Sequence, residues 1–233
     1  EHVRYVARSV KAAAADLGAI ISADGEALTL IDDTGHVLSD DEALLAFVAL
    51  SDTSGPSRVA VPVSATMHVD DLAARRGIDV VRTKLSNPAL MEAASRRGIE
   101  FAANTDGSFI VPDFLPAFDG AAALMKLLEL LAVRDASLGA VVAELPAVHI
   151  VQESVVTPWE QKGAVMRELV ELTKERNVDL IDGVRVSHDH GWALAVPDPE
   201  EPVTQVWAEA TTAGEARRLV QEYARRIRQL QRR

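Results

Sequence analysis

Two acidic side chains stand close together near the start of the chain, in the segment Ser22-Ala23-Asp24-Gly25-Glu26. Hard cations such as Mg²⁺ prefer carboxylate oxygens, so Asp24 and Glu26 are candidate metal ligands. A dedicated cation loop usually supplies at least three oxygen ligands, and only two charged ones occur here. The alternative interpretation is an Asp-Gly turn followed by a solvated glutamate.

A second polar segment, Asn104-Thr105-Asp106-Gly107-Ser108, follows a predicted strand at 101–103. Polar side chains at the carboxyl end of a strand often bind ligands in α/β sheets. Asn104, Asp106 and Ser108 are therefore candidates for contacts with a polar small molecule. The alternative is a loop in which Asn, Asp and Gly serve only to form a turn.

A third segment, Pro197-Asp198-Pro199-Glu200-Glu201-Pro202, joins two predicted strands. Its three carboxylates, Asp198, Glu200 and Glu201, would repel a phosphate group, and its prolines restrict the backbone. The residue types predict a rigid acidic surface loop that does not bind phosphate.

The histidines and arginines form no recognisable catalytic set. His188 and His190 have a spacing that can bind a metal on a strand, but they flank a predicted hairpin turn, so we expect their side chains to face water. A predicted helix at 213–233 carries seven arginines, either as a surface for an anion or partner or as a solvated helix face. The absence of cysteine excludes disulfides, thiolate metal sites and cysteine nucleophiles.

The composition and net charge exclude further classes of function. The 233 residues include 24 Lys and Arg against 35 Asp and Glu, a formal net charge of −11, which argues against nucleic-acid or anionic-membrane partners. No apolar run reaches membrane-span length, and no signal-peptide pattern occurs at the N-terminus. We expect a cytoplasmic protein, and because the chain opens at Glu1 we expect a fragment of something longer.

Strand and helix patterns alternate along the first two thirds of the chain, which is typical of a parallel or mixed α/β sheet. Predicted helices cover 2–17, 40–50, 70–77, 88–98, 118–132, 137–145, 157–176 and 213–233. Predicted strands cover 19–21, 28–31, 36–38, 58–63, 79–83, 101–103, 147–156, 182–187, 192–196 and 203–210. The segments 51–57 and 106–116 are expected to be loops, and the helix at 118–132 is apolar almost all round and is expected to be buried. The fold class is therefore α/β with a mixed sheet, followed by a smaller α+β domain.

Three of these segments together resemble the α-D-phosphohexomutase family, which includes phosphomannomutases and phosphoglucomutases. Residues 17–32 look like the family's metal-loop segment. Residues 81–124 resemble its third domain with the sugar-recognition loop, and residues 182–210 resemble its fourth domain with the phosphate loop. The resemblance covers nearly the whole chain in order and spacing.

This resemblance implies a division of the chain into three parts. Residues 1–40 would be the end of a truncated second domain, residues 41–150 the third domain and residues 151–233 the fourth domain. The family's catalytic serine belongs to a first domain that this chain lacks, so the resemblance implies no catalytic residue here.

The loops depart from the family pattern at the residues that bind ligands. The family's metal loop reads Asp-Gly-Asp-(Gly/Ala)-Asp-Arg, and here Ser22 stands at its first Asp and Ala27 at its Arg. The sugar loop reads Gly-Gly-Glu-x-Ser-Gly-His, and here Asn104, Asp106 and Ser108 stand at its Glu, Ser and His. The resemblance thus implies altered metal and sugar sites, with Mg²⁺ possible but no cofactor required.

The phosphate loop departs furthest. The family pattern is Arg-Pro-Ser-Gly-Thr-Glu-Pro, and here Val196, Asp198 and Glu200 stand at its Arg, Ser and Thr, while Pro197 and Glu201 match. Phosphate binding depends on hydrogen-bond donors and positive charge. The resemblance therefore implies a degenerate module without mutase activity.

A narrower resemblance concerns Thr157-Pro158-Trp159-Glu160-Gln161-Lys162-Gly163 together with the acidic loop 197–202. Both are similar to the C-terminal module of actinobacterial proteins that begin with a mannose-1-phosphate guanylyltransferase-type domain. This implies upstream nucleotidyltransferase and mutase-like domains as partners, with a structural or regulatory role for this chain. A sugar-phosphate-binding or phosphomannomutase-type module with altered specificity, and a homo-oligomeric assembly domain, remain alternatives.

Overall fold

The computed structural model describes residues 2–51 and 57–231, and the chain divides into two compact units, residues 1–147 and 148–233. The three-part division at residues 40 and 150 stays a prediction. Most of the predicted loop at 51–57 lies outside the described residues. In the described part of the chain, no helix is long and apolar enough to cross a membrane.

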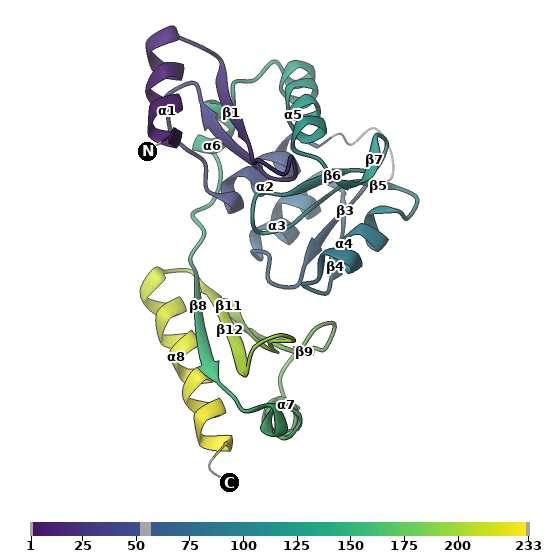
Figure 1. Ribbon diagram of the computed structural model, residues 1–233, viewed down its shortest axis with the longest axis vertical. Helices are drawn as coiled ribbons and strands as arrows, with labels where there is room; N and C mark the ends of the chain where they lie inside the picture. Colours follow the sequence, from purple (N-terminus) through teal and green to yellow (C-terminus); the bar gives the residue numbers. More distant parts are fainter. Residues whose placement is uncertain (1, 52–56, 232–233) are drawn as a thin grey trace. The chain divides into compact units, whose positions relative to one another are not determined.

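The elements of the first unit follow one another along the chain as Figure 1 labels them. They are α1 (His2–Ala13), β1 (Leu17–Ile21), β2 (Leu28–Asp32), α2 (Asp40–Leu50), β3 (Arg58–Pro62), α3 (His68–Arg76), β4 (Asp79–Thr83), α4 (Asn87–Ala94), β5 (Ile99–Ala103), β6 (Phe109–Val111), β7 (Leu115–Phe118), α5 (Gly120–Arg134) and α6 (Leu138–Ala143).

The main sheet of this unit is mixed. Its strand order is β4-β3-β5-β6-β7, in which β3 pairs in parallel with β4 and β5, and the pairs β5–β6 and β6–β7 are antiparallel. Successive side chains along a strand point to opposite faces of the sheet. Ala60, Ala102 and Ile110 pack against α4, and Phe101 and Phe109 contact Phe47 of α2 on the other face. The mixed sheet confirms the predicted fold class.

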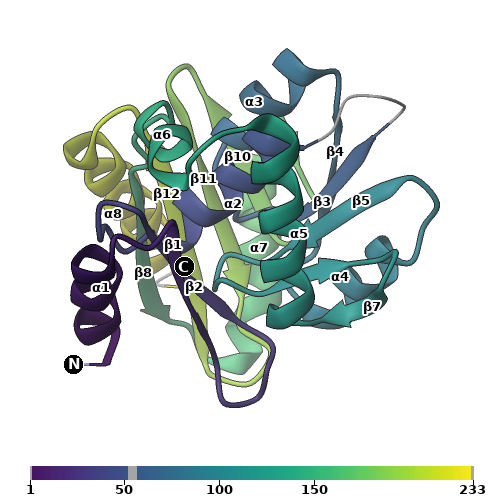
Figure 2. The same cartoon turned by 90° about the horizontal axis from the view of Figure 1, so that it is seen from above.

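A separate hairpin of β1 and β2 stands beside α1 and α5 (Figure 2). Gly18 in β1 is required there, because a Cβ atom at this position would lie 2.5 Å from a methyl carbon of Val10 in α1. The hairpin therefore depends on close contact with the first helix.

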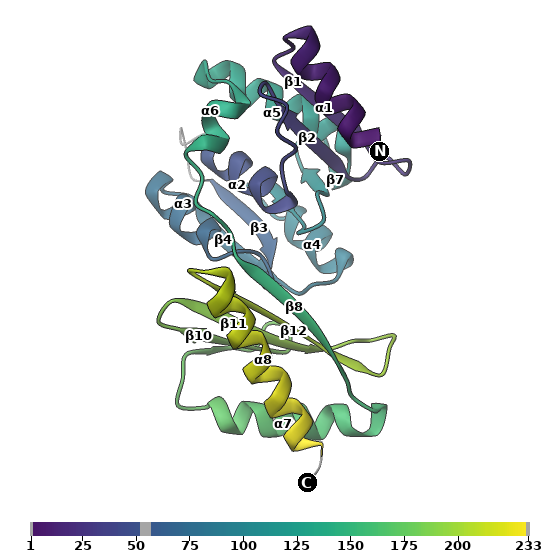
Figure 3. The ribbon, with the colours of Figure 1, turned by 90° about the vertical axis from the view of Figure 1, so that its left-hand side faces the viewer.

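The second unit contains β8 (Ile150–Val156), α7 (Trp159–Thr173), β9 (Val178–Asp179), β10 (Val184–His188), β11 (Gly191–Pro197), β12 (Val203–Ala210) and α8 (Ala213–Leu230). Its sheet has the order β8-β12-β11-β10-β9 and every pairing is antiparallel. Helix α8 runs beside β8 and β12 (Figure 3), where Val220, Tyr223 and Ile227 are buried against the sheet. This is the predicted α+β domain.

Several local predictions were wrong. Residues 36–38 form no strand but only a single bridge between Ile31 and Val37, because the chain turns into the cap of α2. The expected loop at 106–116 contains β6 and the first half of β7, whose short apolar runs stand among Gly, Pro and Asp.

Two helix predictions also need correction. Helix α5 is not buried all round, since Met125 and Val133 are 65% and 72% exposed. Pro158 is the N-cap of α7 rather than its first residue, and α7 ends at Thr173, so the chain can form the short strand β9 that the hydrophobic pattern did not predict.

Candidate functional site

The turn that carries the candidate metal ligands is closed by its own side chains. The Asp24 carboxylate accepts hydrogen bonds from the Ser22 hydroxyl and, at 3.2 Å, from the Glu26 amide. The Ser22 Oγ accepts the amide of Ala27 at 2.9 Å, and Gly25 supplies the positive φ of 84° that the turn needs. The hydrogen bond from the Ser22 hydroxyl, and then that from the Glu26 amide, lowers the pKa of Asp24.

This arrangement does not fit a Mg²⁺ site. One of the two candidate carboxylates, Asp24, already accepts two hydrogen bonds within the turn. Across residues 2–51 and 57–231, no three histidine or acidic side chains group closely enough to hold a metal ion. Mg²⁺ takes six oxygen ligands, usually one or two carboxylates together with several waters, and here one of the two carboxylates of the turn is already bound to donors of the turn itself.

The loop 104–108 lies directly beside this turn, although the two are far apart in the sequence. Ala27 and Ser108 form an antiparallel bridge, and the Leu28 amide donates to the Gly107 carbonyl at 2.9 Å. The amide of Gly120, the first residue of α5, donates to the Gly25 carbonyl at 2.8 Å. The fold thus brings the two candidate ligand-binding segments side by side and sets the turn 22–27 at the N-terminus of α5.

The side chains of loop 104–108 form a polar cluster with residues from two helices. The Asn104 Nδ2 donates to Oδ1 of Asn87 in α4 at 3.2 Å and to Asp106 Oδ2 at 3.3 Å. The other Asp106 oxygen accepts the Ser108 amide at 3.0 Å, and Ser108 itself is buried. Burial first, and then the negative charge of Asp106, raises the pKa of Asp40 in α2.

Sequence reasoning missed Asn87 and Asp40 as members of this cluster. Both stand in the first turn of a helix, where Asn and Asp are common for reasons of capping and helix dipole. Nothing in their local sequence distinguishes these roles from ligand binding. Two neighbouring carboxylates with an amide form a surface that suits sugar hydroxyl groups and repels phosphate.

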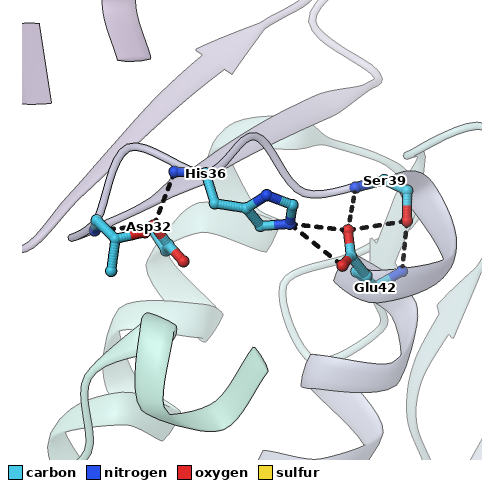
Figure 4. A network of polar contacts seen from close by, with 5 residues as sticks. Asp32, His36, Ser39 and Glu42 are labelled. Atoms are coloured by element: carbon cyan, nitrogen blue, oxygen red, sulfur yellow. Dashed lines mark hydrogen bonds and ion pairs between the residues drawn. The ribbon is translucent and has the colours of Figure 1, made fainter. Parts of the chain in front are cut away.

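A network of hydrogen bonds between β2 and α2 stands at the start of the helix that carries Asp40 (Figure 4). The buried Asp32 carboxylate accepts the amides of Thr34 at 2.8 Å and His36 at 2.9 Å. The His36 Nε2 lies 3.2 Å from both oxygens of Glu42, which completes a capping box with Ser39, the N-cap of α2.

Burial raises the pKa of Glu42, but hydrogen bonds from Ser39 and His36 outweigh it and leave that pKa below its ordinary value. The network therefore fixes the start of α2, where Asp40 follows Ser39.

The acidic loop 197–202 lies in the second unit and is closed by its own aspartate. The Asp198 carboxylate accepts the backbone amides of Glu200 and Glu201, both at 2.9 Å, and the side-chain Nε2 of Gln205 at 3.3 Å. These bonds, that from the Glu200 amide first, lower the pKa of Asp198. The backbone donors at the tip of the loop are thus already occupied by an internal anion.

Lys162 supports the same loop from α7. Its ammonium group donates to the carbonyl oxygens of Asp198 and Glu201, and it lies 3.6 Å from the centre of the Trp159 ring. The lysine is 8% exposed, and its two hydrogen bonds hold the loop against α7. Pro197 is the last residue of β11. Glu200 and Glu201 are exposed.

The expectation that both histidines of the 188–190 hairpin face water was wrong for His188. Its Nε2 lies 3.0 Å from the buried hydroxyl of Tyr223 and its Nδ1 lies 3.2 Å from Arg176. Burial first, and then the charge of Arg176, lowers the pKa of His188. Burial raises the pKa of Tyr223 to about 12. These contacts join β10 to α8, while His190 is exposed.

Comparison with known proteins agrees with this architecture. Residues 39–149 match the family model described as phosphoglucomutase/phosphomannomutase, alpha/beta/alpha domain III. A probable phosphoglucosamine mutase of Methanopyrus kandleri is 32% identical over 226 residues, which are 96% of this chain and 50% of that protein. A phosphoglucomutase/phosphomannomutase of Thermococcus kodakarensis is 27% identical over 93% of this chain and 48% of its own length.

Solved structures share the fold. A phosphoglucomutase/phosphomannomutase family protein from Burkholderia thailandensis has a TM-score of 0.82 at 22% identity and covers 98% of this chain and 50% of its own. An N-acetylphosphoglucosamine mutase from Aspergillus fumigatus, solved with GlcNAc-6P and magnesium, has a TM-score of 0.66 at 14% identity, over 92% of this chain and 49% of its own.

The chain spans about half the length of the curated relatives it matches. The match at residues 39–149, the order of the loops and the shared fold lead to one assignment. Residues 39–149 match the phosphoglucomutase/phosphomannomutase family as its alpha/beta/alpha domain III, and the chain as a whole is similar to phosphohexomutases in sequence and in fold.

Proposed function

We propose that this chain is a degenerate phosphohexomutase module that does not itself carry out the mutase reaction and that serves a structural or regulatory role. The observation that carries the proposal is the Asp198 carboxylate, which accepts the amides of Glu200 and Glu201 in the loop that resembles the family's phosphate loop. A phosphate would compete with this carboxylate for the same backbone donors and would be repelled by its charge.

The turn that resembles the metal loop supports the same proposal. Ser22 and Asp24 hydrogen-bond each other, and Glu26 is the only other carboxylate of the turn. We infer that neither loop supplies the charge that phosphoryl transfer requires, since that reaction depends on donors and cations around the transferring group.

The proposal also places the chain in a longer protein of sugar-nucleotide synthesis. Its support is the resemblance of 157–163 and 197–202 to the C-terminal module of guanylyltransferase-type proteins. The partners would then be nucleotidyltransferase and mutase-like domains of the same protein, with a second copy of the chain as a further possible partner. Determining the coding sequence that precedes Glu1 tests this assignment directly.

Calorimetric titration and a turnover assay test the loss of mutase function. Glucosamine 6-phosphate, mannose 1-phosphate, mannose 6-phosphate and glucose 1-phosphate would each be added with and without Mg²⁺ to the wild type and to Asn104→Ala. We expect no turnover and no binding that depends on Asn104. Micromolar binding, about −8 kcal/mol, that disappears in Asn104→Ala would contradict the proposal.

A second candidate function is a sugar-phosphate-binding module with altered specificity. It is favoured by the pairing of Ala27 with Ser108, which sets the turn beside the polar cluster of Asn104 and Asp106. In this alternative those side chains contact sugar hydroxyl groups. It predicts that neutral sugars bind as well as their phosphates do, and the same titration distinguishes it when mannose and glucosamine are included.

A further inference from the structure

A cavity of about 610 Å³ lies in the first unit, away from the loops discussed above. Its lining comes from the last turns of α2, α3 and α5 and from α6. It lies toward the end of the sheet at which the strands β3 and β4 begin. Loop 104–108 instead follows the carboxyl end of β5, which runs parallel to β3, so it lies at the opposite edge. No residue of loops 22–27 or 104–108 belongs to the cavity lining.

Three arginines from two helices contribute to this lining. Arg75 and Arg76 are in the last turn of α3, and Arg134 is in the last turn of α5. Among the lining residues that the structure describes, Glu144 is the one acid, so the formal charge of these residues is 3 − 1 = +2, in a chain whose net charge is −11. A positive cavity in an acidic protein is a selective place for an anion.

The two arginines of α3 differ from Arg134 in their contacts. In the described ranges 2–51 and 57–231, no ion pair or side-chain hydrogen bond is formed by Arg75 or Arg76. Arg134 donates to the carbonyl oxygen of Ser51 at 3.1 Å, which holds its guanidinium beside the end of α2. Burial first, and then the charge of Arg134, lowers the pKa of Arg76, in agreement with the place of both side chains in one cavity lining.

Helix dipoles account for only part of this arrangement. A cation in the last turn of a helix is stabilised by the partial negative charge there. That preference explains each arginine on its own helix, but it does not require α3 and α5 to direct their arginines into the same cavity. The mutual repulsion is relieved when an anion binds between them.

We propose that Arg75, Arg76 and Arg134 bind a phosphate group in this cavity. Guanidinium groups match phosphate oxygens in pairs, and three of them can engage all the terminal oxygens of a phosphate monoester. The cavity has the volume of sites that hold small organic ligands. Its remaining surface includes the apolar side chains of Leu50, Leu72 and Val141, against which the organic part of a phosphate ester can pack.

Isothermal titration of the full chain tests the site, with inorganic phosphate, inorganic pyrophosphate and glucose 6-phosphate as probes. The test variant is the double change Arg75→Gln with Arg76→Gln. The matched control, Arg96→Gln with Arg97→Gln, removes the same charge at the end of α4, outside the cavity lining. Asn104→Ala separates this site from the polar cluster, and Arg76→Lys keeps the charge while it removes the planar fork.

We expect saturable binding of at least one probe to the wild type, the control and Asn104→Ala. In the test variant the affinity should fall at least about tenfold, or 1.4 kcal/mol, and Arg76→Lys should lie between the two. Equal affinity for inorganic phosphate and glucose 6-phosphate would show that the phosphate alone is recognised, and tighter binding of the ester would assign an organic phosphate.

The proposal is overturned when the wild type binds none of the probes saturably, or when the test variant binds as the wild type does. The result is independent of the proposed function, because that function is tested by turnover and by binding that depends on Asn104. Thermal unfolding of each variant confirms that it is folded, and the charge-retaining Arg76→Lys keeps the test decisive should the double variant unfold.

Discussion

The amide of Leu28 donates a hydrogen bond to the carbonyl oxygen of Gly107 across 2.9 Å. This contact, with the bridge between Ala27 and Ser108, ties the β1–β2 hairpin to the end of β5. A separate hairpin of two strands is marginally stable in water, so the contact gives it a fixed position. It also sets the only two candidate ligand loops of the described part of the first unit side by side.

Gly107→Ala should destabilise the first unit. Gly107 has a φ of 81°, and a Cβ atom there would lie 2.9 Å from Asp40 Oδ1 and 3.2 Å from the Leu28 carbonyl oxygen. We expect the free energy of unfolding to fall by about 1–3 kcal/mol, measured by urea unfolding with circular dichroism. Gly25→Ala, with a similar φ of 84° and no atom within 4 Å, isolates the backbone strain. Equal losses in both variants would show that the contact with Asp40 is unimportant.

Arg82→Gln should also destabilise the first unit, by about 2–4 kcal/mol. The Arg82 side chain is 10% exposed and donates to the carbonyl oxygens of Pro62 at 3.2 Å, Ala65 at 2.8 Å and Thr66 at 3.1 Å. Removing the guanidinium takes one donor from each of these carbonyl oxygens and breaks the ion pair with Asp70. The control Arg96→Gln breaks an exposed pair with Glu92 and should cost less than about 0.5 kcal/mol. A loss for Arg82→Gln as small as that of the control would refute this account.

Asp198 should make the stability of the second unit depend on pH. Hydrogen bonds from the Glu200 and Glu201 amides lower its pKa below the ordinary value of 3.8, so the folded state favours the ionised carboxylate. The resulting stabilisation is complete above the unfolded-state pKa and is lost as the pH falls through the folded-state pKa. Asp198→Asn should therefore be less stable than the wild type near neutral pH, and the difference should shrink in strong acid.

Tryptophan fluorescence measures this effect selectively, because all three tryptophans, Trp159, Trp192 and Trp207, belong to the second unit. Glu175→Gln removes one negative charge from the same unit and serves as the control for charge alone. A stability difference between Asp198→Asn and the wild type that stays constant from neutral pH to strong acid would contradict the assignment.

His188 should affect the same unit at higher pH. Burial and the charge of Arg176 lower its pKa from the ordinary value of 6.5, so the folded state favours the neutral imidazole. That stabilisation is present above the unfolded-state pKa and declines as the pH falls from 6.5 toward the folded-state pKa. The fluorescence-detected melting temperature should fall over this range in the wild type and fall less in His188→Gln. Melting temperatures that fall in parallel in the two proteins would disprove this role of His188.

Local sequence was sufficient for most of the helices and strands of this protein, though not for β6, β7 and β9. The capping residues before α2 and the glycine after α3 mark helix ends, and the alternation of strand and helix predicts the mixed sheet. These features depend on neighbours within a few residues, where backbone preferences and hydrophobic periodicity act directly. The strands β6 and β7 escaped prediction because their short runs are stabilised by pairing with β5, which is not a local property.

Only the tertiary structure decided what the polar residues do. The residue type of Asp24 allows contact with a metal ion, but the structure shows that its carboxylate, like that of Asp198, accepts amides of its own turn. Asp40 and Asn87 read as ordinary helix-cap residues and became neighbours of Asp106 and Asn104 only through packing. The physical reason is that hydrogen bonding and charge depend on distance in space, and long-range packing determines that distance.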